Sequence, residues 1–293
     1  GMSIALGTKV FSRDGKLRDL LKSVEKHPID RVIVADDGKT SEMKESIYSS
    51  NWNFELTVLD LEFDAGLGKG RNAIVNELEE DYLFIVDTDH VLPPNIMDLV
   101  NILRTRDELG GVAGLIFEPN HKRIYDGCRD FEESDNGEVL KFITPKKEVQ
   151  FIEGLSFIPW DFIPNAAVFR HEAVTDYSWD EEYVIGWEHG DFYIGHWKQT
   201  DWQFGICPDV LIRHYPGGDN YYTSNRNSNS KNQDSFKYFL NKWGYTDVEY
   251  VGTGWIDTLD NEPIKRKIED RINEHGILGF GKKLAEATWR FIH

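Results

Sequence analysis

The sequence predicts an α/β protein with a mostly parallel central sheet flanked by helices. Two observations lead to this prediction: short apolar runs that read as strands, and amphipathic segments that separate them through the first 117 residues. A βαβα order of this kind favours parallel strands with helices on both faces. Ligands of such sheets bind beyond the carboxyl ends of the strands, so the residues that follow each strand are the first candidates for a site.

Each element of this half follows from its own pattern. Apolar, β-branched runs predict strands at residues 3–6, 31–36, 54–61, 82–87 and 111–117. Apolar residues at helical spacing predict helices at residues 16–26, 41–50, 70–80 and 94–106.

The pattern changes between residues 118 and about 165, where alternating runs flank Asn136-Gly137. An Asn-Gly pair between alternating runs predicts a β-hairpin insertion. A strand–helix–strand pattern then resumes from Ala166 to Tyr215, and a Gly/Asn/Ser-rich loop follows it. The remaining residues predict a helical C-terminal tail.

Composition narrows the classes of function. The chain has 293 residues, 40% of them apolar, with 33 basic and 51 acidic side chains and a net charge of −18. This acidic balance argues against a nucleic-acid partner, which needs a basic face. Cys128 and Cys207 lie far apart without metal-binding spacing, so we expect reduced, buried thiols. There is no apolar run of 18 residues and no secretory pattern, so we expect a cytoplasmic location.

Asp87 and Asp89 form a D-x-D pair directly after an apolar strand. Two carboxylates in this position can both face one divalent cation. The alternative is an ordinary turn before the helix that starts near Pro93-Pro94.

Two further motifs suit an anionic nucleotide. Asp36-Asp37-Gly38 ends another strand, where carboxylates can accept hydrogen bonds from a base and a ribose, although an Asp-Gly turn looks the same. The segment GLGKGRN (66–72) precedes a helix and includes Gly68 and Lys69 beside Arg71. Its spacing matches neither a dinucleotide fingerprint nor a P-loop. Glycine amides at a helix N-terminus still favour phosphate groups.

In their order and spacing, these three motifs resemble those of glycosyltransferase family 2 and related GT-A enzymes. The resemblance implies that Asp36 and Asp37 contact the nucleotide and that Arg71 contacts the donor. It also implies a nucleotide-sugar donor, with UDP as the nucleotide, and a Mn²⁺ (or Mg²⁺) cofactor on the diphosphate. Asp89 would be the direct metal ligand, and Asp87 would contact the ribose or metal-bound water.

The segment 181–215 resembles the acidic motif and terminal histidine of inverting members of this class, and EHGDFYIGHWK (188–198) is similar to that of β-1,4-N-acetylgalactosaminyltransferases. The usual Glu-Asp pair is replaced by Glu188-His189. The resemblance favours Asp191 as the general base, with Glu188 as the alternative, and a helix would put both on one face. It implies that His189 orients the acidic pair and that His214 is a third metal ligand.

Three further residues are weaker candidates. Trp160 and Trp187 could stack on sugar rings, although core packing is the usual role of tryptophan. Arg226 lies in the Gly/Asn/Ser-rich loop, which in related enzymes closes over the diphosphate; the alternative is a solvated linker. The C-terminal segment predicts a helix packed on the domain, or alternatively one in peripheral contact with the inner membrane face.

The resemblance implies inverting transfer of a hexose or N-acetylhexosamine from a UDP-sugar to a glycan or glycolipid hydroxyl. It implies a glycosyltransferase domain at 1–226, with a donor half at 1–117 and an acceptor half at 118–226, and a helical extension at 227–293. A sugar-1-phosphate nucleotidyltransferase and a non-catalytic sugar-nucleotide-binding module are the rival classes. The first lacks its Gly-rich basic signature after the first strand, and the second is disfavoured by the retained acidic residues.

Overall fold

The computed structural model describes residues 2–217 and 229–261, with shorter stretches at 272, 276–279, 281–282, 284–286 and 289. The chain divides into two compact units, residues 1–256 and 257–293. Within the described residues, no helix is both long and apolar enough to cross a bilayer.

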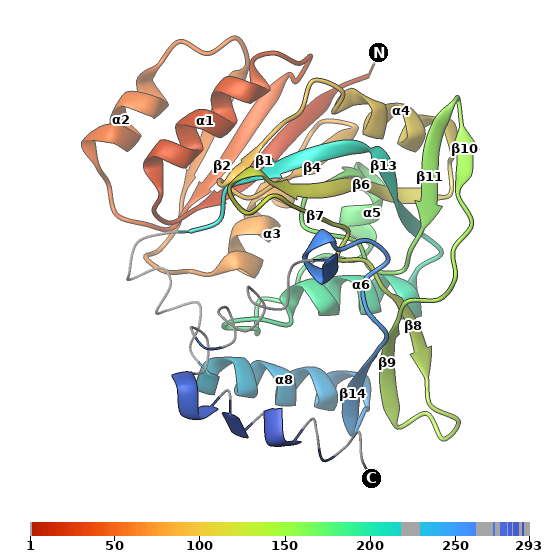
Figure 1. The fold of residues 1–293 in the computed structure, drawn as a ribbon. Helices are drawn as coiled ribbons and strands as arrows, with labels where there is room; N and C mark the ends of the chain where they lie inside the picture. The colour runs from red at the N-terminus through yellow and green to blue at the C-terminus, as the bar shows by residue number, and fades with distance from the viewer. Residues whose placement is uncertain are drawn as a thin grey trace. The chain divides into compact units, whose positions relative to one another are not determined.

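The first unit is built on an eleven-stranded sheet with the order β10-β11-β13-β6-β12-β4-β1-β2-β3, to which β5 and β7 are attached (Figure 1). The described strands are β1 (Ile4–Val10), β2 (Arg31–Asp36), β3 (Glu55–Asp60), β4 (Tyr82–Ile85), β5 (His90–Val91), β6 (Leu109–Glu118), β7 (Arg123–Tyr125), β8 (Asp130–Glu133), β9 (Val139–Ile143), β10 (Gln150–Ile152), β11 (Leu155–Pro159), β12 (Ala167–Arg170), β13 (Gln203–His214) and β14 (Asp247–Val251). The helices are α1 (Asp14–Val24), α2 (Glu42–Ser49), α3 (Leu67–Glu77), α4 (Met97–Thr105), α5 (His171–Asp176), α6 (Glu188–Gln199) and α8 (Asn229–Trp243), with 3-10 turns η1 (Pro119–His121) and η2 (Thr258–Asn261).

The strands and helices predicted in the first 117 residues all form. The largest differences are at β1, which continues to Val10, and at α3, which begins at Leu67. The added part of β1 includes Gly7, Thr8 and Lys9, which do not continue the apolar run that predicts the strand. Gly7 is needed there because a Cβ atom would lie 2.5 Å from Ile74 Cγ2 on α3.

The sheet is mixed rather than mostly parallel. Strands β4, β1, β2 and β3 pair in parallel, as do β6 and β13. The other pairings of this sheet are antiparallel. Two of them arise because β12 runs in the opposite direction between β4 and β6. The parallel block is the part that places the carboxyl ends of β1, β2 and β4 together.

Successive side chains along the strands point to opposite faces of the sheet and pack in two separate hydrophobic cores. On β1, Ile4 and Leu6 pack in the core beneath α1, α2 and α4, while Ala5 packs in the core that α3, α6 and α8 cover. This alternation is the period-2 geometry of a strand buried on both faces. Figure 1 shows the helices on opposite sides of the sheet.

The predicted hairpin insertion is β8 and β9, which pair antiparallel across a turn that contains Gly137 at φ 72°. β14 extends this small sheet by pairing in parallel with β9. Phe239 of α8 is fully buried in the second core. The compact unit therefore continues past residue 226 to residue 256, and the region expected to be a helical tail includes a strand.

Candidate active site at the carboxyl ends of the strands

The D-x-D pair lies in a tight turn between β4 and β5. The Asp87 carboxylate is one-third exposed, whereas the Asp89 side chain is 6% exposed. The turn is closed by the His90 backbone N–H, which donates to the Asp87 carbonyl, and by the Asp87 backbone N–H, which donates to His90 Nδ1 at 2.9 Å. The two carboxylates therefore have separate environments, one open to a ligand and one buried.

Asp89 lies at the centre of a charged cluster. Its Oδ2 atom is 2.7 Å from Arg13 Nη1 and 3.0 Å from His214 Nε2. Although burial raises the pKa of this carboxyl, the hydrogen bond from His214 and the nearby cationic groups hold it well below its usual range. Burial lowers the pKa of His214, but the Asp89 and Glu118 carboxylates outweigh it and raise the pKa overall.

The residues of this cluster fit a divalent cation. Ligand atoms of Asp89, His90 and His214 lie within 4.8 Å of one another. Asp89 Oδ1 is buried and has no hydrogen-bond partner among the described residues. His90 is the poorest ligand of the three, because its Nδ1 lone pair accepts the Asp87 N–H and its Nε2 atom then carries the proton. A carboxylate with an imidazole is a donor set that suits Mn²⁺.

Arg71 and Asn72 connect this turn to the second half of the chain. The buried guanidinium of Arg71 has its Nη2 atom 3.6 Å from Asp87 Oδ1 and lies over the Trp179 ring. The Asn72 side-chain amide donates to the Trp179 carbonyl at 2.7 Å and accepts from the Trp179 N–H at 3.1 Å. The pair brings the residue 179 segment against the D-x-D turn.

The Asp-Asp-Gly motif holds two loops in place. Asp36 is paired with Lys44 at 3.0 Å and with the Tyr48 hydroxyl at 2.6 Å. Asp37 is fully buried, pairs with Lys9 at 2.8 Å and accepts the Gly66 N–H at 3.0 Å. These contacts hold the end of β2, where the sequence predicts that the nucleotide binds. Gly38 is required because a Cβ atom would lie 1.8 Å from the Phe11 carbonyl oxygen.

Gly68 lies in the first turn of α3, since this helix begins at Leu67. A Cβ atom there would be 3.1 Å from the Asp180 carbonyl oxygen. Gly68 therefore allows the segment after Trp179 to approach α3 closely.

Asp191 does not suit the role of general base that the resemblance favoured. Its side chain is fully buried in α6. It accepts from the Tyr177 hydroxyl at 2.6 Å, the Tyr183 hydroxyl at 2.7 Å and Trp243 Nε1 at 3.1 Å, and it pairs with Lys242 at 2.8 Å. A base must contact the proton that it abstracts, and among the described residues this carboxylate is surrounded by four protein donors.

Glu188, the alternative base, has the opposite surroundings. It is the first residue of α6, is partly exposed and makes no described hydrogen bond or ion pair. The next residue, His189, donates from Nε2 to the Ile163 carbonyl at 2.8 Å. Burial and then the Arg71 charge lower the pKa of His189 to about 3, so it is neutral. His189 and Arg71 thus place the start of α6 near the Asp87 turn.

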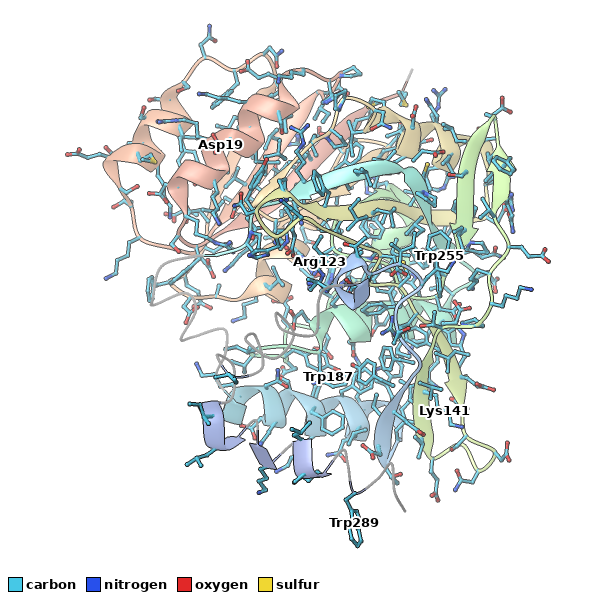
Figure 2. The ribbon with its side chains drawn as sticks, viewed as in Figure 1. Asp19, Arg123, Lys141, Trp187, Trp255 and Trp289 are labelled. Carbon is cyan, nitrogen blue, oxygen red and sulfur yellow. The ribbon has the colours of Figure 1, made fainter. Side chains whose placement is uncertain are left out.

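The remaining candidates from the sequence are Trp160, Trp187 and Arg226. Trp160 is 2% exposed, with Lys147 Nζ 4.4 Å from its ring centroid, so it is a core residue rather than a sugar platform. Trp187 packs against Phe236 and Phe239 of α8, with ring centroids 4.9 Å apart in both pairs, and it lies beside that helix in Figure 2. Arg226 lies outside the described residues.

Three site residues were missed by sequence reasoning. Glu118 hydrogen-bonds His214, Arg13 hydrogen-bonds Asp89 and the Gly217 carbonyl, and Lys16 donates to the Tyr215 carbonyl. Glu118 could have been predicted from the sequence, because it is an acidic residue at the end of an apolar strand, as Asp36 is. No pattern marked Arg13 or Lys16.

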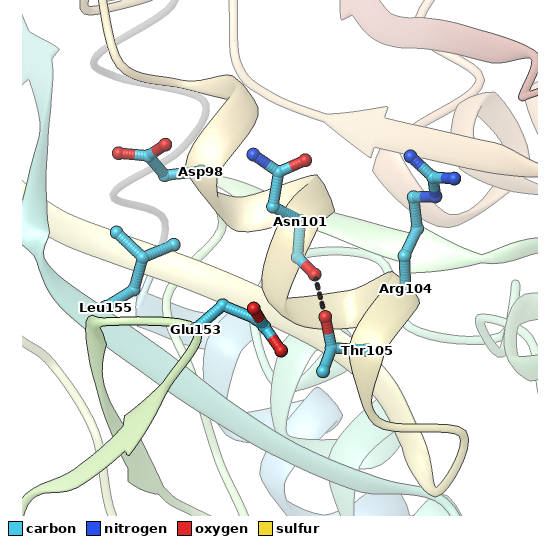
Figure 3. A pocket seen from close by; sticks show the side chains of 6 residues that line it. All are labelled: Asp98, Asn101, Arg104, Thr105, Glu153 and Leu155. Atoms are coloured by element: carbon cyan, nitrogen blue, oxygen red, sulfur yellow. Dashed lines mark hydrogen bonds between the residues drawn. The ribbon is translucent and has the colours of Figure 1, made fainter.

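A hollow of about 500 Å³ between α4 and the β10–β11 turn lies apart from these residues (Figure 3). None of the residues that the sequence nominated for the site lines it. Its lining consists of Asp98, Asn101, Arg104, Thr105, Glu153 and Leu155.

A D-x-D turn, a facing histidine and a block of parallel strands agree with the GT-A class of glycosyltransferase fold, and comparison with solved structures shows the same fold. The GalNAc-T7 structure with UDP, GalNAc and Mn²⁺ matches with a TM-score of 0.61 at 13% identity, over 82% of this chain and 48% of that one. Residues 9–174 match the profile of Glycosyl transferase family 2, so this chain belongs to that family.

Other matches are similar in kind. Beta-1,4 N-acetylgalactosaminyltransferase 2 of Mus musculus is 26% identical over 221 residues, which are 72% of this chain but only 39% of the relative's length. S. aureus TarS 1–349 has a TM-score of 0.52 at 14% identity, over 73% of this chain and 60% of that one. The mannosyltransferase PcManGT of Pyrobaculum calidifontis, with GDP-Man and Mn²⁺, has a TM-score of 0.51 at 12% identity, over 86% and 65%.

Proposed function

We propose that this chain catalyses metal-dependent, inverting transfer of a hexose or N-acetylhexosamine from a UDP-sugar to a hydroxyl group of a glycan or glycolipid. The observation that carries the proposal is the pairing of Asp89 with His214 at 3.0 Å beside an open Asp87, at the carboxyl end of β4. The UDP, GalNAc and Mn²⁺ named for the GalNAc-T7 structure, and the GDP-Man and Mn²⁺ named for PcManGT, support metal-dependent transfer from a nucleotide-sugar. The comparisons do not support the peripheral membrane contact.

The donor half of the reaction is assigned to the strand ends. Asp89 and His214 would hold the divalent cation, which when bound would neutralise the charge that grows on the leaving diphosphate. Asp87, one-third exposed and 3.6 Å from Arg71, would accept a hydrogen bond from a ribose hydroxyl. Asp36 and Asp37 hold the base-side loop and are assigned to the nucleotide.

The acceptor half is assigned to the start of α6, with Glu188 in place of Asp191 as the base. Glu188 would take the proton from the acceptor hydroxyl, whose oxygen forms a bond to the anomeric carbon. The bond between that carbon and the diphosphate oxygen breaks on the opposite side, which inverts the configuration. Base assistance of this kind contributes about 10²–10⁴-fold in rate.

Calorimetric titration with UDP, ADP and GDP, each with Mn²⁺ and with EDTA, tests the donor assignment. We expect UDP to bind selectively and only with Mn²⁺. Selective binding of GDP instead would keep the metal site but reject the UDP assignment. No binding of any nucleotide would overturn the proposed function.

The stereochemical claim has a separate test. After turnover with the UDP-sugar that the protein accepts, the anomeric coupling constant of the product reports its configuration by NMR. An anomeric configuration opposite to that of the donor is expected, and a retained configuration would reject the inverting mechanism together with Glu188 as base.

A further inference from the structure

Glu118 and His214 end two neighbouring parallel strands. β6 and β13 pair with Arg213 opposite Phe117, so the next residue on each strand, His214 and Glu118, stand side by side. This register depends on an irregularity between Cys207 and Leu211, where the residues opposite them on β6 are the consecutive Gly114 and Leu115. Gly114 makes room for it, because a Cβ atom there would lie 2.7 Å from the Val210 carbonyl oxygen.

The Glu118 carboxylate is buried and held by several donors. The side chain is 6% exposed, with Oε1 3.2 Å from His214 Nδ1 and Oε2 2.8 Å from His121 Nδ1. The Tyr125 hydroxyl of β7 is a further side-chain partner. A carboxylate fixed on both oxygens cannot follow the imidazole, so the imidazole must take the orientation that the carboxylate sets.

The two ring nitrogens of His214 therefore have divided roles. A carboxylate only accepts, so the contact with Glu118 places a proton on Nδ1. Nε2 is the atom directed at Asp89 Oδ2, 3.0 Å away. The contact with Asp89 places a second proton, on Nε2, when no cation is bound. A bound cation would take the place of that proton, and the neutral imidazole would keep its proton on Nδ1, toward Glu118, and present the Nε2 lone pair to the cation.

We propose that Glu118 is a positioning residue that orients His214 toward the divalent cation shared with Asp89. This inference rests on the proposed function, because it assumes that His214 is a metal ligand. Glu118 itself is not assigned as a ligand, since its contact is with the ring nitrogen that faces away from Asp89.

Mn²⁺ affinity of the whole chain, measured by calorimetry without nucleotide, tests the proposal. Loss of a carboxylate behind a metal-binding histidine costs about 10–100-fold in metal affinity. We expect a loss of that size for Glu118→Ala and a smaller one for Glu118→Gln, whose amide oxygen can still accept from Nδ1–H. Glu132→Ala, an exposed glutamate on β8, is the control and should bind as the wild type does.

A double-mutant cycle separates positioning from a general effect on stability. His214→Ala should itself weaken Mn²⁺ binding, and adding Glu118→Ala to it should cause no further loss, because Glu118 acts through the imidazole. An equal additional loss in both backgrounds, or wild-type affinity in Glu118→Ala, would overturn the inference. If the wild type binds Mn²⁺ only when UDP is present, the same variants are compared with UDP present. If it binds Mn²⁺ under neither condition, the proposed function fails, and this inference fails with it.

Discussion

At the residue scale, Asp89 combines two opposite environments on one carboxylate. Oδ2 is bound by Arg13 and His214, whereas Oδ1 is buried without a described partner. A buried carboxylate oxygen is costly to leave unpaired, and such exceptions often mark the place of a ligand or ion. This is the residue on which loss of the metal can be tested most directly.

Asp89→Asn is expected to abolish Mn²⁺-dependent UDP binding, because a neutral amide is a poor ligand and also loses the pair with Arg13. Calorimetry with Mn²⁺ and with EDTA measures the effect. Asp135→Asn, in the exposed turn of the β8–β9 hairpin, is the matched control. Wild-type affinity in Asp89→Asn under both conditions would remove this residue from the metal site.

Glu188→Gln is expected to keep Mn²⁺–UDP binding while lowering the rate of transfer by about 10²-fold or more, since the base is lost and the donor contacts remain. Steady-state kinetics and calorimetry on the same preparation measure both. A full rate with a bound donor would exclude Glu188.

Asp191→Asn should instead lower stability. It weakens a buried carboxylate with four protein partners, and hydrogen bonds to charged groups contribute about 1.5–3 kcal/mol each. We expect the free energy of unfolding to fall by roughly 2–3 kcal/mol. Urea denaturation reports it. Unchanged stability with a large loss of transfer would restore Asp191 as the base.

At the scale of elements, α6 links the site to the C-terminal part of the first unit. Its N-terminus carries Glu188 and His189 near Arg71. The same first turn is tied to α8 through Asp191, which contacts Lys242 and Trp243. The far end of α6 carries His196, which is 1% exposed and whose Nδ1 contacts the Thr200 hydroxyl. The helix thus begins with a partly exposed glutamate and continues with buried, hydrogen-bonded side chains.

The buried His196 side chain should make the free energy of unfolding depend on pH. Burial lowers its pKa to about 4, whereas an unfolded histidine titrates near about 6.5. Between these values the unfolded state binds more protons, so stability is lost as the pH falls. From pH 7 to pH 5 the loss from this one residue is about 2 kcal/mol.

His196→Leu should remove this contribution while filling a similar space. Urea denaturation of both proteins at pH 7 and pH 5 isolates it, because groups with the opposite sign, such as Asp161 with its pKa raised to about 6, are present in both. An equal loss of stability in the two proteins would contradict the assignment.

At the scale of the whole molecule, the first unit needs α8 and β14. Phe239 is fully buried, and β14 continues the β8–β9 sheet from Asp247 to Val251. Truncating one buried Phe costs about 3–5 kcal/mol, against a total stability of about 5–15 kcal/mol for a typical domain. Loss of the entire helix should therefore exceed what the unit can tolerate.

A chain that ends at residue 256 is expected to unfold in one cooperative transition and to keep Mn²⁺-dependent UDP binding. A chain that ends at residue 226 should lose both. Thermal denaturation by circular dichroism and calorimetry compare the two. Cooperative folding of the shorter chain would put the domain boundary at 226, as the sequence resemblance implied.

Sequence patterns alone were enough to predict the elements of the first 117 residues and the strand ends that Asp36, Asp87 and Asp89 follow. These follow from local patterns, because period-2 and period-3.6 burial is written within each segment. The family motifs can also be recognised from short segments of the sequence. The direction of β12 does not, since an antiparallel insertion between β4 and β6 depends on pairing across the whole chain.

Which side chains of the motifs are exposed and which are buried depends on contacts between segments that are distant in the sequence. Glu188 and Asp191 are three residues apart on one helix, yet Tyr177, Lys242 and Trp243 bury the second and leave the first partly exposed. Glu118 is 96 residues from His214 in the chain and hydrogen-bonds it only because β6 and β13 pair in register. Burial and hydrogen-bond partners are set by such distant segments, and no local pattern contains them.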